Sequence, residues 1–155
     1  MKEDLIDAAA RELQEETGVE GIEIEFLNTY GDYDRDPRTR VITSAFVSLI
    51  KAEDVNVIAG DDADSAEWFE VGFSAGNEYK LIVNEREYKA REYNIVLSGE
   101  RVDVTLTATT RQVWNSDGYI KNKHTEVLLS EKIATDHAAI ITDGILRIID
   151  IKNNN

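Results

Sequence analysis

Strand periodicity fills the middle of this chain, between one segment of helical periodicity at each end. Residues 3–17 have an apolar side chain at every fourth position, and Gly18 follows, a residue that readily takes the left-handed conformation that ends a helix. Residues 136–149 repeat the helical pattern after Thr135, the expected N-cap. The buried stripe expected on this second helix is Ile141, Ile145 and Ile148. This order of elements predicts the α+β class.

Between the two helices, alternating or β-rich stretches predict a series of strands. They cover residues 22–27, 40–50, 67–71, 79–83, 93–97, 101–109 and 119–129. The stretch 40–50 is apolar enough for a central strand. Residues 52–66 are polar and acidic, which indicates a loop, and a second loop is expected around Pro37, the single proline.

Length, charge and cysteine content narrow the class of protein. A chain of 155 residues predicts a single domain over 1–155. The chain has no cysteine and no apolar run near the roughly 20 residues of a membrane span, so we expect a cytoplasmic protein without a membrane partner. The net charge of −14 disfavours nucleic-acid binding. A phosphate-bearing substrate would need a divalent cation to offset this charge.

Three carboxylates share one face of the first predicted helix. Glu12, Glu15 and Glu16 stand at positions i, i+3 and i+4, where like charges repel by about 0.2–0.5 kcal/mol per pair. Carboxylates, water and substrate phosphates are the oxygen ligands that Mg²⁺ takes. From the spacing alone, the face is either a solvated surface or a cation site.

The wider pattern around these carboxylates is more specific. From Glu3 the chain reads E-x7-R-E-L-x-E-E-T-G-V, which resembles the Nudix box G-x5-E-x7-R-E-U-x-E-E-x-G-U, where U is an aliphatic residue. The resemblance implies that Glu12, Glu15 and Glu16 bind Mg²⁺ or Mn²⁺, and that one of them orients or deprotonates water. It also implies that Arg11 and Glu3 form a supporting ion pair that fixes the helix and its ligands.

A second stretch, residues 30–40, resembles a loop of the ADP-ribose-pyrophosphatase-like Nudix subgroup. The resemblance makes three arginines candidates for holding a phosphate or ribose of the substrate: Arg35, Arg38 and Arg40. In the alternative interpretation, which we favour for these side chains, they pair with the aspartates of the same loop. Those aspartates are Asp32, Asp34 and Asp36.

Two further stretches resemble the same subgroup. Within residues 60–69, Asp61 or Asp62 is the candidate for an additional carboxylate facing substrate, metal or water, and a plain polar turn is the alternative. Trp68 is expected in the core. Residues 136–141 resemble the final helix of the subgroup, where His137 has a structural role.

The resemblance covers residues 3–71 and 134–149, so residues 72–133 are interpreted as an inserted β region. The opening glycine of the box would precede Met1, and we therefore expect the N-terminal strands of the family to be absent. The implied fold is a mixed sheet with helices on both faces. Without those strands, the apolar run 41–50 would be an exposed edge. Either residues 72–133 fold back to cover this edge, or two chains supply strands to each other. We favour the second and predict a homodimer with the inserted hairpin at or near the interface.

The function implied by the resemblance is metal-dependent hydrolysis of nucleoside-diphosphate-linked, ADP-ribose-like substrates by attack of water on the pyrophosphate. The alternative is a catalytically impaired Nudix fragment or a ligand-binding sensor module. A DNA-binding regulator is disfavoured, because Nudix regulators add a winged helix after the Nudix domain and the chain ends at Asn155. The expected partner is a small nucleotide substrate.

Overall fold

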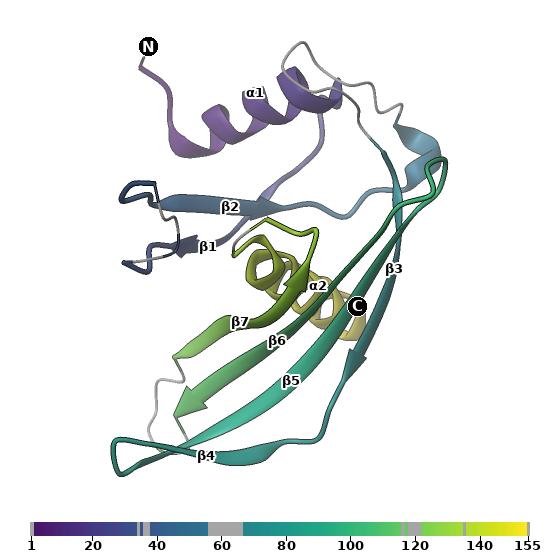
Figure 1. The fold of residues 1–155 in the computed structure, drawn as a ribbon. Helices are drawn as coiled ribbons and strands as arrows, with labels where there is room; N and C mark the ends of the chain where they lie inside the picture. The colour runs from purple at the N-terminus through teal and green to yellow at the C-terminus, as the bar shows by residue number, and fades with distance from the viewer. Residues whose placement is uncertain are drawn as a thin grey trace. The chain divides into compact units, whose positions relative to one another are not determined.

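The computed structural model describes residues 2–33, 35, 38–55, 67–115, 117, 122–134 and 136–154 (Figure 1). The chain divides into two compact units, Met1–Trp68 and Phe69–Asn155. Both contain a helix and antiparallel strands, which confirms the α+β class. The described strands form two sheets, one in each unit, rather than one continuous sheet. Over these ranges, no helix has both the length and the apolar character needed to cross a membrane.

The first unit begins with α1, Leu5–Thr17, which confirms the helix expected at 3–17. Gly18 ends it in the left-handed conformation with φ 71°, and its N–H donates to the carbonyl of Gln14 at 2.8 Å. The apolar stripe of α1 is only partly covered. Leu5 is 59% exposed, whereas Ala9 and Leu13 are half-buried.

A two-stranded sheet completes the regular structure of this unit. Strand β1, Glu25–Tyr30, pairs antiparallel with β2, Thr43–Val47, and the rings of Phe26 and Phe46 meet edge to face at 5.7 Å. The prediction of a strand at 22–27 was wrong by three residues, because pairing with β2 starts at Glu25 and a bulge follows Phe26. The strand expected at 40–50 is reduced to β2, which has β1 as its partner in this sheet. Residues Ala52–Asp54 form the short 3₁₀ helix η1.

The second unit is built around one long strand, β5, Arg86–Gly99. On one side it pairs first with β4, Tyr79–Val83, and further along with β3, Phe69–Ala75. On the other side lies β6, Thr105–Asn115, followed by β7, Lys123–Glu131. The order β3-β5-β6-β7 forms a five-stranded antiparallel sheet with β4 at its edge.

The expected strands of this region are confirmed with changed ends. The strand expected at 101–109 starts only at Thr105, because Gly99 and Val104 close a tight turn through the Gly99 N–H and the Val104 carbonyl at 2.9 Å. The 67–71 strand runs on to Ala75, and the 93–97 strand is the second half of β5. Of the strand expected at 119–129, residues 119–121 lie outside the described residues, and the rest belongs to β7.

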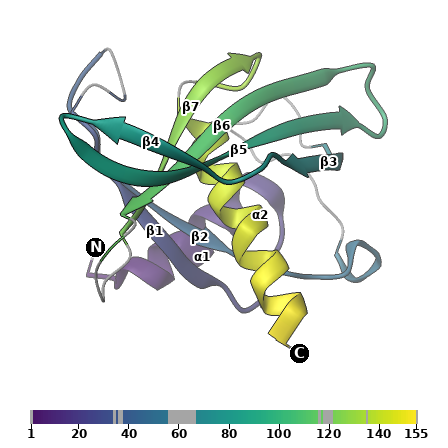
Figure 2. The ribbon, with the colours of Figure 1, turned by 90° about the horizontal axis from the view of Figure 1, so that it is seen from below.

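Helix α2, His137–Asn154, lies across β5, β6 and β7 of this sheet (Figure 2). The expected stripe of Ile141, Ile145 and Ile148 was wrong, since these side chains are only half-buried. The buried residues of α2 are Ala138, Ala139 and Thr142. Small side chains at these positions allow the helix backbone to approach the sheet closely. The expected N-cap, Thr135, lies outside the described residues.

Polar contacts fix how α2 sits on its sheet. The hydroxyls of Thr110 and Thr142, both fully buried, are hydrogen-bonded at 2.8 Å. The next residue of α2, Asp143, accepts hydrogen bonds from both strands. Thr125 of β7 donates to its carboxylate at 2.6 Å, and Gln112 of β6 donates to the same oxygen at 3.5 Å. Buried polar groups need partners, so these bonds select one register of helix on sheet.

Candidate active site on the first helix

Helix α1 holds the three carboxylates that the sequence singles out. Glu12, Glu15 and Glu16 follow one another at helical spacing, so they project from one side of the helix. The side chains of Glu12 and Glu15 are 56% and 58% exposed, and Glu16 is exposed as well. All three carboxylates are therefore accessible to a ligand from solvent.

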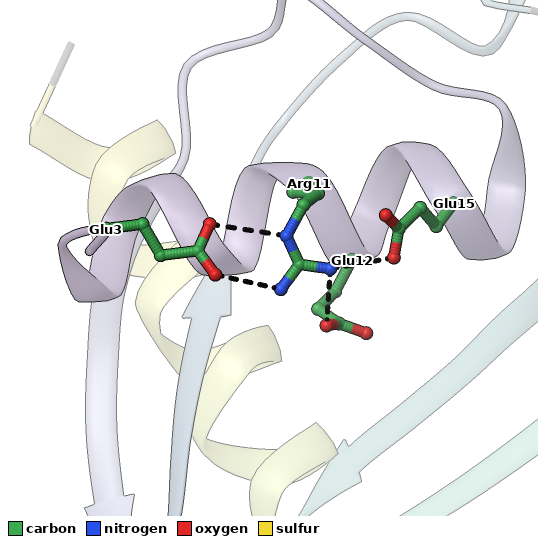
Figure 3. Close-up of polar contacts among 4 residues, drawn as sticks. All are labelled: Glu3, Arg11, Glu12 and Glu15. Carbon is green, nitrogen blue, oxygen red and sulfur yellow. Dashed lines mark hydrogen bonds and ion pairs between the residues drawn. The ribbon is translucent and has the colours of Figure 1, made fainter. Parts of the chain in front are cut away.

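Arg11 connects two of these carboxylates to Glu3, which precedes the helix (Figure 3). Its guanidinium donates through Nε and one terminal nitrogen to both oxygens of Glu3, at 3.2 and 3.1 Å. The other terminal nitrogen lies 2.7 Å from Glu15 and 2.8 Å from Glu12. One planar cation thus binds three carboxylates at once, in the fork geometry typical of arginine.

The charge of this cluster is strongly negative. Arg11 supplies one positive charge against the three carboxylates of Glu3, Glu12 and Glu15, which leaves a net −2 before Glu16 is added. The hydrogen bond with Glu3, and next the one with Glu12, raise the pKa of Arg11 above its usual range. The guanidinium therefore remains charged at every pH at which the protein is handled.

The donor atoms of the cluster fit a hard divalent cation. Carboxylate oxygens are the ligands that Mg²⁺ takes, and those of α1 are exposed enough to reorient. Among the described residues, no three acidic or histidine side chains already converge as a metal site, because Glu12 and Glu15 are turned to Arg11. Ligation by these two carboxylates would exchange contacts with Arg11 for contacts with the cation.

Two of the three candidate substrate arginines hold the loop before β2. Arg35 donates to the hydroxyl of Thr43 at 2.7 Å. Arg40 donates to the carbonyls of Gly31 and Asp32, the latter at 2.8 Å. These contacts of the two arginines are thus structural. The side chain of Arg38 is exposed.

The remaining candidates are aspartates of two loops, Trp68 and His137. Asp34, Asp36, Asp61 and Asp62 lie outside the described residues. Trp68 is half-buried at the end of the first unit. His137 is exposed at the start of α2, where its backbone N–H and ring Nδ1 both contact the carbonyl of Ala134, at 2.9 and 3.0 Å. This is the structural role expected for it.

One feature of the candidate site was not predicted from the sequence. The motif implied a pair of Arg11 with Glu3, but not the additional ion pairs of Arg11 with Glu12 and Glu15. The signal was present, because Arg11 stands next to Glu12 and four residues before Glu15, a spacing at which side chains on a helix meet.

Comparison with known proteins places this helix in a family. The NUDIX domain matches residues 1–91, which is more than half of the chain. An ADP-ribose pyrophosphatase of Methanocaldococcus jannaschii is 38% identical over 65 residues, which cover 42% of this chain and 37% of the relative. The matched segment is thus little more than a third of that relative's length. No solved structure gives a significant match.

Proposed function

The chain belongs to the Nudix family, and from this premise we propose that it is a metal-dependent hydrolase of nucleoside-diphosphate-linked substrates. The observation that carries the proposal is the arrangement on α1. Three accessible carboxylates, Glu12, Glu15 and Glu16, stand at the motif positions, and Arg11 binds Glu3 beside them. Like charges at this spacing repel by about 0.2–0.5 kcal/mol per pair, a cost that a bound cation would remove.

In the proposed reaction, water attacks one phosphorus of the pyrophosphate. Its oxygen forms the new P–O bond, the bridging P–O bond breaks, and the other phosphate leaves. The proton of the water passes to a carboxylate of the cluster or to solvent. Glu12, Glu15 and Glu16 would hold Mg²⁺ or Mn²⁺, and one of them would orient or deprotonate the water. When bound, the cation supplies Lewis-acid chemistry to the phosphoryl group and the water.

The charge of the protein supports a requirement for a divalent cation. The chain carries −14, and the described cluster adds no free positive charge, since Arg11 is shared among three carboxylates. A substrate diphosphate is itself an anion and would be repelled from α1. A cation bound between the carboxylates and the phosphates offsets the repulsion among the carboxylates and the repulsion between them and the substrate.

The proposed substrate class is ADP-ribose-like. Its support is the name of the archaeal relative, an ADP-ribose pyrophosphatase, together with the loop that carries the candidate arginines. We propose Arg35, Arg38, Arg40 and Asp62 as substrate contacts. For Arg35 and Arg40 this contact would be made while they hold the loop through Thr43 and Gly31, so they would position backbone as well as substrate.

The test is an assay of AMP release from ADP-ribose with Mg²⁺ or Mn²⁺. The matched pair of variants is Glu12→Gln/Glu16→Gln on α1 and Glu53→Gln/Glu70→Gln, which removes the same charge from exposed sites on η1 and β3. We expect the first to lose at least about 100-fold in kcat, since it removes two groups of one catalytic unit, and the second to remain unchanged. Equal losses, or turnover that persists in excess chelator, would contradict the proposal.

A ligand-binding module that does not hydrolyse is the second candidate. The observation that favours it is the occupation of Glu12 and Glu15 by Arg11, which leaves no preformed metal site among the described residues. Such a module would bind ADP-ribose in the presence of metal, with no AMP released over hours. Calorimetric binding together with the assay above separates the two functions.

Three further properties remain proposals. We propose that residues 72–133 are an insertion into a Nudix domain whose final helix is α2, that the protein is a homodimer, and that it works in the cytoplasm. The homodimer rests on exposed apolar side chains of the first unit, Phe26, Ile42 and Leu49. The location rests on the lack of cysteine.

A further inference from the structure

The second unit contains a hollow that the proposed hydrolase chemistry does not use. It has a volume of about 580 Å³ and is partly open to solvent. The described residues that line it all belong to the second unit, between Leu81 on β4 and Glu126 on β7. Small-molecule sites have volumes of about 300–1,000 Å³, so the hollow has the size of such a site.

The strand register explains which side chains reach the hollow. Tyr88 of β5 stands opposite Leu81 on one side and opposite Asn115 of β6 on the other. Two residues back along β6, Val113 stands opposite His124 of β7. Cross-strand partners and residues two apart share one face of a sheet. These side chains therefore lie on a common face of β4, β5, β6 and β7.

This face is the one that α2 leaves uncovered. Residues of β6 that alternate with Val113, namely Thr110 and Gln112, contact α2 through Thr142 and Asp143. The hollow consequently lies on the opposite side of the sheet from the helix. Its floor is made by half-buried side chains, including Leu81, Tyr88 and Val113, and its rim by exposed polar ones, Asn122 and His124.

The charges of the described lining residues cancel. They include one cation, Arg111, and one carboxylate, Glu126, and Arg111 Nε donates to that carboxylate at 2.7 Å. The hydrogen bond with Glu126, and next the hydrogen bond with Tyr79, raise the pKa of Arg111, so the guanidinium stays charged. An incoming anion would have to displace Glu126 from Arg111, and an incoming cation would face the guanidinium.

The remaining groups specify the shape of a ligand. The ring of Tyr88 offers aromatic surface, while Leu81, Val83 and Val113 offer apolar surface. The amide of Asn122, which is exposed at the rim, offers hydrogen bonds to a polar edge. Flat rings gain most from such walls.

We propose that this face of the second unit is a binding site for an uncharged, flat aromatic small molecule with a hydrogen-bonding edge. The site is independent of the carboxylates on α1. The two functions can therefore fail or succeed separately, and the experiment below uses no hydrolase readout.

Three probes of one shape and different charge test the proposal on the full chain. Benzamide is neutral, benzoate is its anionic counterpart and benzamidine its cationic counterpart. Each is titrated into ¹⁵N-labelled protein while amide and indole resonances are followed. We expect benzamide to bind in the millimolar range and to shift the amides of lining residues on β4–β7, among them Leu81, Tyr88 and Val113, with the Trp68 indole as an internal reference outside the hollow. Benzoate and benzamidine should bind at least about threefold more weakly.

Neighbouring residues of β4 provide the matched variants. Leu81 lines the hollow, whereas Ile82 points to the opposite face and is 72% exposed. Leu81→Ala should weaken benzamide at least about fivefold, and Ile82→Ala should leave it unchanged. Should Leu81→Ala fail to fold, Tyr88→Leu removes the ring while keeping an apolar side chain and carries the same expectation.

Three results would contradict the proposal. Absence of shifts with benzamide, or shifts confined to other parts of the chain, would overturn the site. Equal affinity of the three probes would overturn its preference for an uncharged ligand. An equal loss in Leu81→Ala and Ile82→Ala would show that the variants act through the stability of the sheet, which also contradicts a specific hollow.

Discussion

Arg11 donates two hydrogen bonds to the carboxylate of Glu3, eight positions earlier in the chain, at 3.2 and 3.1 Å. The pair joins the residues before α1 to the middle of the helix, while the same guanidinium reaches Glu12 and Glu15. Arg11 thus sets the position of two proposed metal ligands through its contact with a residue outside the helix. We expect Arg11 to affect the geometry of the proposed metal ligands more than the stability of the fold, because exposed ion pairs contribute little to stability.

The first prediction concerns the fork geometry of Arg11. Arg11→Lys keeps the charge but cannot make two parallel bonds to Glu3. We expect the affinity for Mn²⁺, measured by calorimetry, to fall about tenfold, the lower end of the effect of ligand-supporting residues. The melting temperature should change little. Arg86→Lys, at the exposed end of β5, is the control that should leave both quantities unchanged.

The second prediction concerns stabilisation by metal. A ligand that binds only the folded state at 100 times its Kd stabilises by about 2.7 kcal/mol. For a chain of this size that corresponds to a rise in melting temperature of about 5–10 °C with Mg²⁺ or Mn²⁺. The rise should disappear in Glu12→Gln/Glu16→Gln and persist in Glu53→Gln/Glu70→Gln. An identical rise in both variants would mean that the carboxylates of α1 form only a solvated surface.

The third prediction concerns the buried hydroxyl pair between α2 and its sheet. Thr142→Val leaves the fully buried hydroxyl of Thr110 without the partner it has at 2.8 Å. The free energy of unfolding should fall by about 1–3 kcal/mol. Thr110→Val/Thr142→Val should cost less than the sum of the single variants, because it removes both polar groups together. Thr107→Val, whose hydroxyl has only a 3.5 Å contact with Glu131, is the control.

The fourth prediction concerns alkaline pH. Burial raises the pKa of Tyr93 above its usual 10, although the charge of nearby Arg91 opposes the shift. The folded state therefore keeps the phenol proton where the unfolded state loses it, so this contribution to stability is complete below pH 10 and is lost as pH rises above it. The free energy of unfolding, measured with denaturant between pH 9 and 11, should decline less in Tyr93→Phe than in the parent protein. Tyr33→Phe, at a side chain 87% exposed, should decline like the parent protein.

Residue patterns predicted the local structure well where local chemistry decides it. Gly18 ends α1 through its own left-handed conformation, and Tyr79–Val83 forms a strand with the expected bounds. The motif around Glu3 and Arg11 identified two side chains that do lie in contact. These features depend on neighbours in the sequence or on a spacing that a helix fixes.

The patterns failed where packing between distant segments decides the outcome. On α2 the isoleucines gave the stronger apolar signal, yet Ala138 and Thr142 are buried because the helix approaches the sheet closely. On β6 the buried Thr110 has a polar side chain whose partner is 32 residues away, a pairing that no local period contains. The start of β1 at Glu25, three residues later than expected, likewise follows from where pairing with β2 begins.

The last prediction concerns assembly and rests on exposed apolar side chains of the first unit. Ile42 is 66% exposed, and Leu49 and Phe26 are both 50% exposed. In the described sheet, β2 has β1 as its partner, and an apolar strand edge favours pairing with another chain. Sedimentation velocity across micromolar concentrations should give a species of twice the 17.5 kDa chain mass.

Ile42→Lys/Leu49→Lys should shift this species to the monomer, because two buried charges oppose an apolar interface. Ile149→Lys, at a partly exposed position of α2, should leave the dimer intact. A 17.5 kDa species at every concentration would refute the homodimer and show that the exposed apolar side chains are compatible with a single chain in solution.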